Sequence, residues 1–509
     1  MAMDLKKLQN GSDIRGVAAP GVPDEPVTLT PESAFLLTKG FACWLEKNCS
    51  RPISELKISV GHDSRITADT LKKAVCDGLV AMGCTVLDCG LASTPSMFMS
   101  TVFPELACDG AIMITASHLP FNRNGLKFFN RNGGLDKPDI AKVIELAGQN
   151  ITGTGSGKIE KAPLIDIYSR HLVELIRKGA NRTDDYDRPL KGLKIIVDAG
   201  NGAGGFFVEK VLKPLGADTT GSQFLEPDGM FPNHIPNPEN KEAMKSVCSA
   251  VLKNNADLGI IFDTDVDRSS AVDRYGKEIS RNAIIALISA IIAQQHPGTA
   301  IVTDSVTSDE LTEFIEHDLN CRHHRFKRGY KNVINEAIRL NQSGEDCQLA
   351  IETSGHAALK ENYFLDDGAY LTAKLLIKAA QMAVEGKSLD MLIAGLRHPL
   401  EACEIRLKIT ASDFKAYGTK MLEDFKAFAE GQKEYQIAPV NHEGVRVNLD
   451  QQNGNGWMLV RLSLHDPIIP VNIESNSAGG CKQIAAKLID FLRPYQEIDV
   501  TSLEQFLEN

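Results

Sequence analysis

The chain has 509 residues, of which 55 are basic and 66 are acidic, and its formal net charge is −11. A single hydrophobic core stops growing at roughly 250 to 300 residues, so three or four domains are expected. The acidic balance disfavours nucleic acid or an anionic membrane as a partner, because both are usually bound by clustered Lys and Arg. It leaves room for a small anionic ligand held by a few well-placed cations.

The first residues, MAMDLKKLQNGSD, contain no apolar run after the lysines, so no secretory signal is visible. The longest uncharged apolar run, residues 283–293, is shorter than the ~20 residues of a bilayer span. We therefore expect a cytoplasmic protein without a membrane partner. The 11 cysteines are scattered and include no C-x-x-C pair, which favours reduced, packed thiols over disulfides or a zinc site.

Short apolar runs that end in Gly or Asp alternate along the chain with longer helical patterns. This alternation is typical of α/β units with parallel strands. Runs of this kind occupy residues 56–60, 85–87, 111–114, 193–197 and 258–262. Ligands of open α/β sheets bind beyond the carboxyl ends of the strands, so the loops that follow these runs are where we expect the chemistry.

Composition indicates where domains meet. A Gly- and Thr-rich stretch lies at residues 151–157, and the turn HPGT lies at residues 296–299. Near residue 397 a long helical pattern, 367–396, gives way to strand-like residues at 404–409. These joints predict four domains, which span residues 1–160, 161–298, 299–396 and 397–509.

The segments around Gly61, Asp198 and Asp304 share one pattern, a strand followed by a polar or Gly-rich turn and then a helix. This similarity predicts an α/β fold in which the first three domains are related α/β units with mixed, mainly parallel sheets. The fourth domain is expected to be a smaller α+β unit, and the four together are expected to surround a central cleft.

Three aspartates directly follow the apolar run at residues 258–262, in the sequence DTDVDR. The carboxylates of Asp263, Asp265 and Asp267 can converge on one hard cation such as Mg²⁺ and leave room for a phosphate oxygen. An EF-hand fits poorly, because arginine stands where that loop requires Gly and again where it requires a bidentate Glu. The sequence therefore predicts a magnesium site in this loop.

Two other strand-end loops carry polar groups. TASHLP at residues 115–120, followed by NGLK at 124–127, offers a serine nucleophile with acid/base partners. ETSGH at residues 352–356 places a carboxylate, a hydroxyl and an imidazole on one turn, where they can bind sugar hydroxyls and move protons. Taken alone, each motif is also compatible with ordinary capping and turn hydrogen bonds.

Together these loops resemble, in order and over essentially the whole chain, the motifs of the α-D-phosphohexomutase superfamily, which includes phosphoglucomutases and phosphomannomutases. The superfamily's phosphoserine loop, T-A-S-H-N-P with N-G-x-K, is similar to TASHLP and NGLK. Its metal loop, D-G-D-x-D-R, is similar to DTDVDR, and its sugar loop, G-E-x-S-G-H, to IETSGH. SDIRG, GHDSR, VDAGNGAGG, PDGMFPNHIPNPEN and RGYKNV also resemble family segments.

The resemblance implies a role for each matched residue. Ser117 would carry the phosphoryl group, and Ser117 together with Asp263, Asp265 and Asp267 would hold Mg²⁺. Arg15 and Arg268 would supply fixed positive charge, whereas Lys127 and His356 would act as general acid and base. The implied substrate-binding residues are Lys331, Glu352, Ser354, Arg461 and Ser463. The four predicted domains become, in order, the phosphoserine, metal-binding, sugar-binding and C-terminal phosphate-binding domains.

The activity implied is interconversion of hexose 1-phosphate and hexose 6-phosphate, with glucose as the first candidate sugar and mannose as the second. The reaction would pass through phosphoserine and a hexose 1,6-bisphosphate, which would also serve as activator or phosphoryl donor. Small-molecule hexose phosphates are therefore the expected partners, and the sequence indicates no oligomeric state.

One motif departs from the family. The phosphate loop R-P-S-G-T-E-P corresponds here to RLSLHDP at residues 461–467, so Leu464 replaces glycine and His465 replaces threonine. Backbone N–H groups approach a phosphate less freely beside these larger side chains. Leu119 and Thr264, which stand where the family has Asn and Gly, are smaller departures.

A changed phosphate loop suits a second hypothesis, a hexose 1,6-bisphosphate synthase that charges its serine from a bisphosphorylated donor and releases the bisphosphate. A third hypothesis is an inactive homologue that binds sugar phosphates. The joint presence of the serine, the three aspartates, Arg268, Lys127 and His356 disfavours it, because a binding protein does not need that set.

Overall fold

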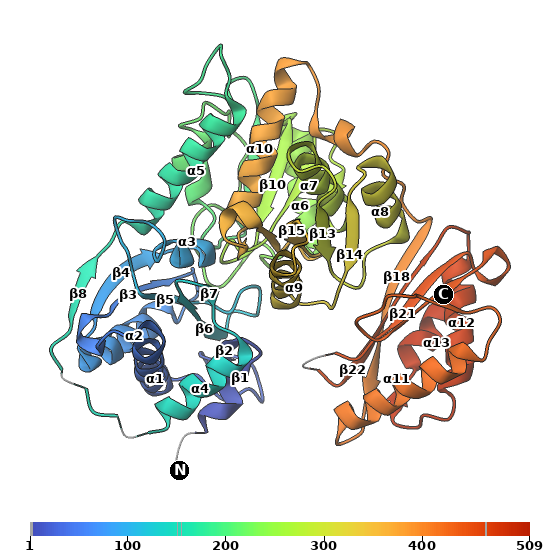
Figure 1. Ribbon diagram of the computed structural model, residues 1–509, viewed down its shortest axis with the longest axis horizontal. Coiled ribbons are helices and arrows are strands. Elements are labelled where there is room, and N and C mark those ends of the chain that lie inside the picture. The colour runs from blue at the N-terminus through green and yellow to red at the C-terminus, as the bar shows by residue number, and fades with distance from the viewer. Residues whose placement is uncertain (1–3, 150, 154, 464–465, 509) are drawn as a thin grey trace. The chain divides into compact units, whose positions relative to one another are not determined.

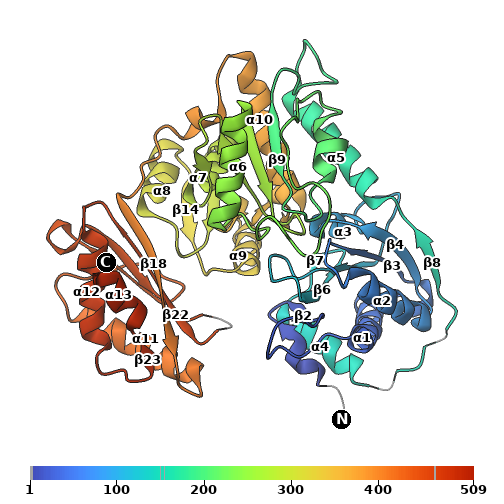
Figure 2. The same ribbon diagram turned by 180° about the vertical axis from the view of Figure 1, so that it is seen from behind.

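A computed structural model of the protein describes residues 4–149, 151–153, 155–463 and 466–508. The chain divides into two compact units. The first unit comprises residues 1–292 and 354–394, and the second comprises residues 293–353 and 395–509. Figures 1 and 2 show the elements of each unit from opposite sides.

The N-terminal sheet of the first unit has the strand order β1-β2-β6-β5-β3-β4-β8, with β7 paired to β6. The pairings of β3 with β5 and β4, and of β4 with β8, are parallel, whereas β6 is antiparallel to both β5 and β2. The strands are β1 (Gln9–Asn10), β2 (Asp13–Val17), β3 (Lys57–His62), β4 (Thr85–Leu91), β5 (Gly110–Ile114), β6 (Arg123–Asn130), β7 (Gly133–Gly134) and β8 (Lys158–Lys161).

Three helices, α1 (Pro31–Cys49), α2 (Ala68–Met82) and α4 (Lys137–Ala147), build the main core of this part of the chain (Figures 1 and 2). Their apolar side chains pack with those of β3, β5 and β6 in one cluster. The short helix α3 (Thr94–Met99) and the helix α5 (Leu164–Ala180) follow later in the chain. Apolar runs covered in this way explain why β5 is buried at every position.

The second sheet of the first unit has the order β12-β11-β10-β9. β10 (Leu258–Phe262) is parallel to β9 (Ile195–Asp198) and antiparallel to β11 (Ser269–Asp273), which pairs with β12 (Glu278–Ile279). The helix α6 (Lys241–Asn254) packs its apolar residues on this sheet. A short hairpin, β16 (Ala357–Leu359) and β17 (Leu365–Asp366), leads into α10 (Gly368–Val384).

The helical pattern predicted over residues 367–396 is interrupted, and this part of the expectation was wrong. α10 ends at Val384, and Gly386 adopts a left-handed backbone with a φ of 68°. A separate 3₁₀ helix then spans Leu389–Ile393. Residues 385–388, Glu-Gly-Lys-Ser, contain no apolar side chain and are the sequence signal for this break.

The second unit contains a parallel sheet of β14 (Arg322–Arg325), β13 (Ala300–Thr303) and β15 (Cys347–Ile351). α8 (Asp309–Glu313) and α9 (Tyr330–Gln342) belong to the same segment. The C-terminal part of the second unit is an antiparallel sheet with the order β19-β20-β21-β22-β18-β23. This sheet shares a core with the helices on one of its faces (Figure 1). These elements are β18 (Glu401–Ile409), β19 (Gln436–Ile437), β20 (Val445–Leu449), β21 (Gly456–Val460), β22 (Ile468–Ser475), β23 (Ile498–Asp499), α11 (Phe414–Glu430), α12 (Gly480–Leu492) and α13 (Thr501–Glu508).

The fold class is the one that the sequence predicts, with mixed α/β sheets followed by a C-terminal α+β part. In the first two sheets, β6 and β11 return directly from the loops after β5 and β10 and pair antiparallel to those strands. The domain boundaries at residues 160, 298 and 396 stay a prediction.

The apolar run 283–293 forms most of α7 (Asn282–Gln295), whose residues 283–292 are all buried. Among the described residues, no helix combines the length and the apolar character that a membrane crossing requires. All eleven cysteines are described and are free thiols. Burial raises the pKa of several of them, that of Cys84 to about 12, so these thiols are unreactive at neutral pH.

Candidate active site

The serine of the predicted phosphoserine loop lies directly after β5. The chain turns at residues 115–122 and returns as β6, so the loop stands at the carboxyl end of a buried strand. Ser117 is 4% exposed and has a φ of 51°, a left-handed backbone that non-glycine residues rarely adopt. Its N–H donates to Thr115 Oγ1 at 2.9 Å. Such backbone conformations need strong support from their surroundings.

Much of that support comes from Arg65, which is 2% exposed. One of its terminal nitrogens donates to the carbonyls of Pro120 and Arg123, each at 2.8 Å. The other donates to the carbonyls of Ser117 and Leu119. One guanidinium therefore collects four carbonyl groups of the loop and fixes its shape.

The metal loop follows β10 and meets the serine. Ser117 Oγ donates to Asp263 Oδ2 at 3.0 Å, and Arg268 Nη2 lies 3.0 Å from the same hydroxyl oxygen. Arg268 is itself 2% exposed and forms an ion pair with Asp263 through Nε at 3.1 Å. The hydroxyl thus lies between a carboxylate and a guanidinium, which is suitable for a group that carries and transfers a phosphoryl.

Lys127, on β6, lies among the carboxylates of the metal loop. Its Nζ is 2.9 Å from Asp265 Oδ2 and 2.5 Å from Asp267 Oδ2. Burial, followed by repulsion from Asp267 and Asp265, raises the pKa of Asp263 well above its usual range. Burial also acts to raise the pKa of Asp267, but Lys127 and His356 more than offset this and hold that pKa below its usual range. The ammonium therefore compensates charge that the closely spaced carboxylates cannot carry alone.

The sugar loop contributes His356 to the same unit. The backbone of Arg268 forms an isolated bridge with that of His356, so the two loops are joined directly. His356 Nδ1 lies 2.5 Å from Asp366 Oδ2 on β17 and 3.9 Å from Asp267 Oδ1. Burial acts to lower the pKa of His356, but Asp366 and Asp267 outweigh it and raise the pKa to about 9. The imidazole is therefore protonated at neutral pH and can act as an acid.

Two more predicted residues belong to the first unit. Arg15, on β2, is a half-buried cation whose Nη2 forms an ion pair with Asp13 at 3.0 Å. β2 pairs with β6, and Arg15 stands opposite Gly125, two residues before Lys127. Ser354 is 6% exposed, and its buried Oγ has no hydrogen-bond partner among the described residues.

The remaining predicted residues belong to the second unit. Glu352 is 3% exposed and accepts a hydrogen bond from Gly329 N at 2.5 Å, and Lys331 lies two residues further on in the first turn of α9. Arg461 follows β21 directly and is 8% exposed. Ser463 Oγ accepts from Asp466 N at 3.2 Å. The substitutions at Leu464 and His465 lie outside the described residues.

Comparison with known proteins identifies the family of this chain. Models for the phosphoglucomutase/phosphomannomutase α/β/α domains I, II and III match residues 6–153, 167–276 and 280–399. A phosphoglucomutase/phosphomannomutase of Thermococcus kodakarensis is 30% identical over 99% of this chain and 100% of its own. The chain belongs to the phosphoglucomutase/phosphomannomutase family. That family is part of the α-D-phosphohexomutase superfamily, and the chain is an enzyme of the phosphotransferase, mutase type.

Other family members show how widely the similarity extends. A phosphoglucosamine mutase of Alkaliphilus oremlandii is 29% identical over 96% of this chain and 99% of its own. The crystal structure of a phosphoglucomutase/phosphomannomutase family protein from Burkholderia thailandensis has a TM-score of 0.77 at 25% identity, covering 95% of this chain and 96% of that one. Relatives with different sugar names match this chain at similar identity, so overall similarity does not select the sugar.

The residues present fit the Mg²⁺ that this family uses. Asp263, Asp265 and Asp267 each place one carboxylate oxygen within 4.8 Å of the others, and all three are buried. The buried Oδ1 atoms of Asp265 and Asp267 have no hydrogen-bond partner among the described residues. Hard oxygen donors without partners are what a divalent cation requires.

Several residues at the site were not among the sequence predictions. His118 Nδ1 lies 2.6 Å from Arg268 Nη2, and burial, followed by Arg268 and Arg15, lowers the pKa of this imidazole to about 2. Thr94, at the start of α3, donates through Oγ1 to Asp265 Oδ2 and through N to Asp265 O. Arg268 Nη1 donates to Asn237 Oδ1 at 3.1 Å. His118 and Asn237 stand in family-like segments, whereas no sequence signal singled out Thr94.

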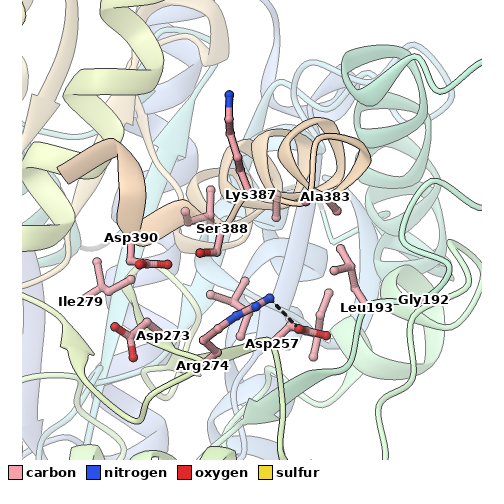
Figure 3. Close-up of a pocket in the computed structure, with 15 residues that line it drawn as sticks. Gly192, Leu193, Asp257, Asp273, Arg274, Ile279, Ala383, Lys387, Ser388 and Asp390 are labelled. Atoms are coloured by element: carbon pink, nitrogen blue, oxygen red, sulfur yellow. Dashed lines mark hydrogen bonds and ion pairs between the residues drawn. The ribbon is translucent and has the colours of Figure 1, made fainter. Parts of the chain in front are cut away.

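A cavity of about 260 Å³ lies elsewhere in the first unit (Figure 3). It adjoins Ile195 and Leu258, at the starts of β9 and β10, whereas the metal loop follows the end of β10. Arg274 and Asp257, which both line this cavity, form an ion pair at 2.9 Å. Of the described residues that line this cavity, none is a predicted site residue.

Replacing Arg65 by lysine should lower kcat while changing KM much less. A lysine ammonium cannot bind four carbonyl groups in one plane, so the loop that holds Ser117 would shift, and misplacement of a reacting group by about 1 Å costs about 10²-fold in rate. Steady-state kinetics of Arg65→Lys measures both parameters. Arg51→Lys, at an ion pair with Asp109 and with a side chain 42% exposed, is the control. A rise in KM at unchanged kcat would contradict the positioning role.

Proposed function

We propose that the enzyme interconverts hexose 1-phosphate and hexose 6-phosphate through a phosphoserine at Ser117 and a hexose 1,6-bisphosphate intermediate. The observation that carries this proposal is the position of Ser117 Oγ, 3.0 Å from both Asp263 Oδ2 and Arg268 Nη2. A serine held between a fixed guanidinium and a metal-binding carboxylate suits phosphoryl transfer, in which positioning and charge stabilisation do most of the catalytic work.

Each half-reaction transfers one phosphoryl group. In the first, a free hydroxyl of the hexose phosphate attacks the phosphorus on Ser117, the new P–O bond forms, and the bond to Ser117 Oγ breaks. The attacking hydroxyl gives up a proton and the serine oxygen gains one. The bisphosphate then turns over, and Ser117 Oγ takes its other phosphoryl group by the same steps in reverse.

Lys127 and His356 are the general acid and base that we propose for these proton transfers. Lys127 Nζ lies beside Asp265 and Asp267 on the serine side of the site. His356, with a pKa raised to about 9, is a ready proton donor at neutral pH. Arg15 and Arg268 would stabilise the transferring group as fixed positive charges.

Asp263, Asp265 and Asp267, together with a phosphate oxygen on Ser117, would hold Mg²⁺, which when bound neutralises charge that develops on the phosphoryl oxygens. A hexose 1,6-bisphosphate would act as activator by phosphorylating a serine that has lost its phosphate. In this cycle Lys331, Glu352 and Ser354 bind the sugar, and Arg461 and Ser463 bind the phosphate remote from Ser117.

Glucose is the first candidate sugar and mannose the second. The two differ at one hydroxyl, which we expect the turn at Glu352 to Ser354 to contact. The buried Oγ of Ser354, without a described partner, supports a hydrogen bond to the sugar at this turn.

A hexose 1,6-bisphosphate synthase is the second candidate function. The observation that favours it is the sequence of the loop after Arg461, where leucine and histidine replace the glycine and threonine of the family loop. Backbone N–H groups approach a phosphate less freely beside these larger side chains. Weaker retention of the remote phosphate would let the bisphosphate leave before it turns over.

Two parallel assays separate the candidates. In the first, glucose 1-phosphate with Mg²⁺ and a trace of glucose 1,6-bisphosphate is supplied, and glucose 6-phosphate is measured. In the second, a bisphosphorylated donor replaces the trace, and net bisphosphate formation is measured. We expect isomerisation to be the faster reaction. Rapid bisphosphate production with slow isomerisation would replace the mutase by the synthase. The absence of both reactions would contradict both candidate functions.

A further inference from the structure

Arg461 in the second unit has an unusual environment for a residue expected to bind phosphate. Its side chain is 10% exposed, and its Nε is buried without a hydrogen-bond partner among the described residues. Its Nη1 lies 3.9 Å from Glu443 Oε1. The guanidinium that is expected to bind a phosphate therefore already has a carboxylate of the same chain beside it.

Two hydrogen bonds hold that carboxylate in place. Glu443 Oε2 accepts a hydrogen bond from Ser305 Oγ and another from Arg328 N at 3.1 Å. The side chain of Glu443 is 11% exposed. A charged group anchored by two donors and largely shielded from water exerts a stronger field on its neighbours than a mobile surface carboxylate does.

The backbone around Glu443 also fixes its position. Gly444 has a φ of 60°, and a Cβ there would lie 2.2 Å from Val460 O and 2.8 Å from Arg461 Cα. Only glycine allows the loop to approach the end of β21 so closely. The Asn441 side chain closes the loop by donating to Gly444 O at 2.7 Å. The approach of Glu443 to Arg461 is thus built into the fold of this part of the chain.

We propose that Glu443 weakens the hold of Arg461 on the remote phosphate and thereby favours release of hexose 1,6-bisphosphate. The inference rests on the proposed function, in which Arg461 binds that phosphate. A phosphate that binds Arg461 comes close to the carboxylate of Glu443, which lies beside the same guanidinium, and the two negative charges repel each other. The repulsion acts on every bound species whose remote phosphate uses Arg461, including the bisphosphate.

The other charges around Arg461 do not remove this effect. Burial lowers the pKa of Arg461, and Glu443 is the strongest of the nearby groups that oppose it, ahead of Glu404 and Asp304. Arg328 is a second cation in this environment and acts in the opposite direction. Glu443 is accordingly the carboxylate whose neutralisation changes the field at Arg461 most.

Direct binding tests the inference without turnover. Ser117→Ala is combined with Glu443→Gln, and the Kd for glucose 1,6-bisphosphate and for glucose 1-phosphate is measured by calorimetry. Glutamine removes the charge and keeps an oxygen that accepts from Ser305 and Arg328, so the loop is expected to stay folded. We expect both Kd values to fall about tenfold, which corresponds to about 1.4 kcal/mol. Glu443→Asn, a shorter neutral side chain, serves as a second variant.

The matched control is Glu434→Gln, which removes a charge 3.5 Å from Lys487 in the same part of the chain. With Ser117 intact, Glu443→Gln should also release less labelled bisphosphate into solution for each isomerisation. Unchanged or weaker binding in both Glu443 variants, while hexose phosphates still bind, would overturn the inference and leave the proposed function standing. Absence of hexose phosphate binding in every variant would overturn the proposed function and the inference with it.

Discussion

Ser117→Ala is expected to abolish turnover, with kcat reduced by at least about 10⁴-fold. The variant lacks the only hydroxyl that lies between Asp263 and Arg268 in the described site, and alanine can neither receive nor return a phosphoryl group. The isomerisation of glucose 1-phosphate measures the loss. Incubation with labelled glucose 1,6-bisphosphate and Mg²⁺, followed by mass spectrometry of the peptide that contains residue 117, measures phosphorylation directly.

Ser169→Ala is a suitable control because it removes another buried hydroxyl of the first unit. Its Oγ has no hydrogen-bond partner among the described residues, so its loss should leave both activity and phosphorylation unchanged. Substantial turnover by Ser117→Ala would contradict the phosphoserine mechanism. Phosphorylation of the wild-type enzyme at another residue would contradict it as well.

The site illustrates what strand-end reasoning can predict. Fully buried apolar runs ending at Ile114 and Phe262 form β5 and β10, and the expected serine and aspartates follow them. The sequence did not reveal that these loops return as antiparallel strands, which brings Lys127 back beside the metal loop. A contact between side chains 138 residues apart, such as that of Lys127 with Asp265, depends on strand order, which residue patterns do not encode.

The residues that contact the proposed catalytic groups carry less sequence signal than those groups do. Asp366, on β17, orients His356. In the sequence, however, Asp366 has the same context as any other aspartate that stands shortly before a helix. Thr94 reaches Asp265 from the first turn of α3, where a threonine would ordinarily be read as a cap. Such residues act through geometry set by tertiary packing, and a single sequence carries little signal for them.

Asp265→Asn is expected to weaken metal binding by at least about 100-fold and to lower kcat by about 10² to 10⁴-fold at saturating Mg²⁺. Asp265 is fully buried and shares Lys127 with Asp267. An amide at this position removes one of the three carboxylate charges that would neutralise a bound divalent cation. Lys127 and Thr94 would still find an oxygen to donate to, which limits structural damage. Binding is measured with Mn²⁺ as a paramagnetic probe, independently of turnover.

Asp273→Asn is the control for this substitution, because Asp273 ends β11 in the same sheet and accepts from Tyr275 N and Lys277 N through one oxygen that an amide retains. It should bind Mn²⁺ like the wild type. Chelation of divalent cations should stop the wild-type enzyme, and added Mg²⁺ should restore it. Full activity in excess chelator, or equal Mn²⁺ binding by Asp265→Asn and the control, would show that the three aspartates serve Lys127 and Arg268 rather than a metal. The lysine would then be the permanent counter-charge of this loop, whereas a magnesium site can use the Oδ1 atoms of Asp265 and Asp267, because Lys127 contacts only their Oδ2 atoms.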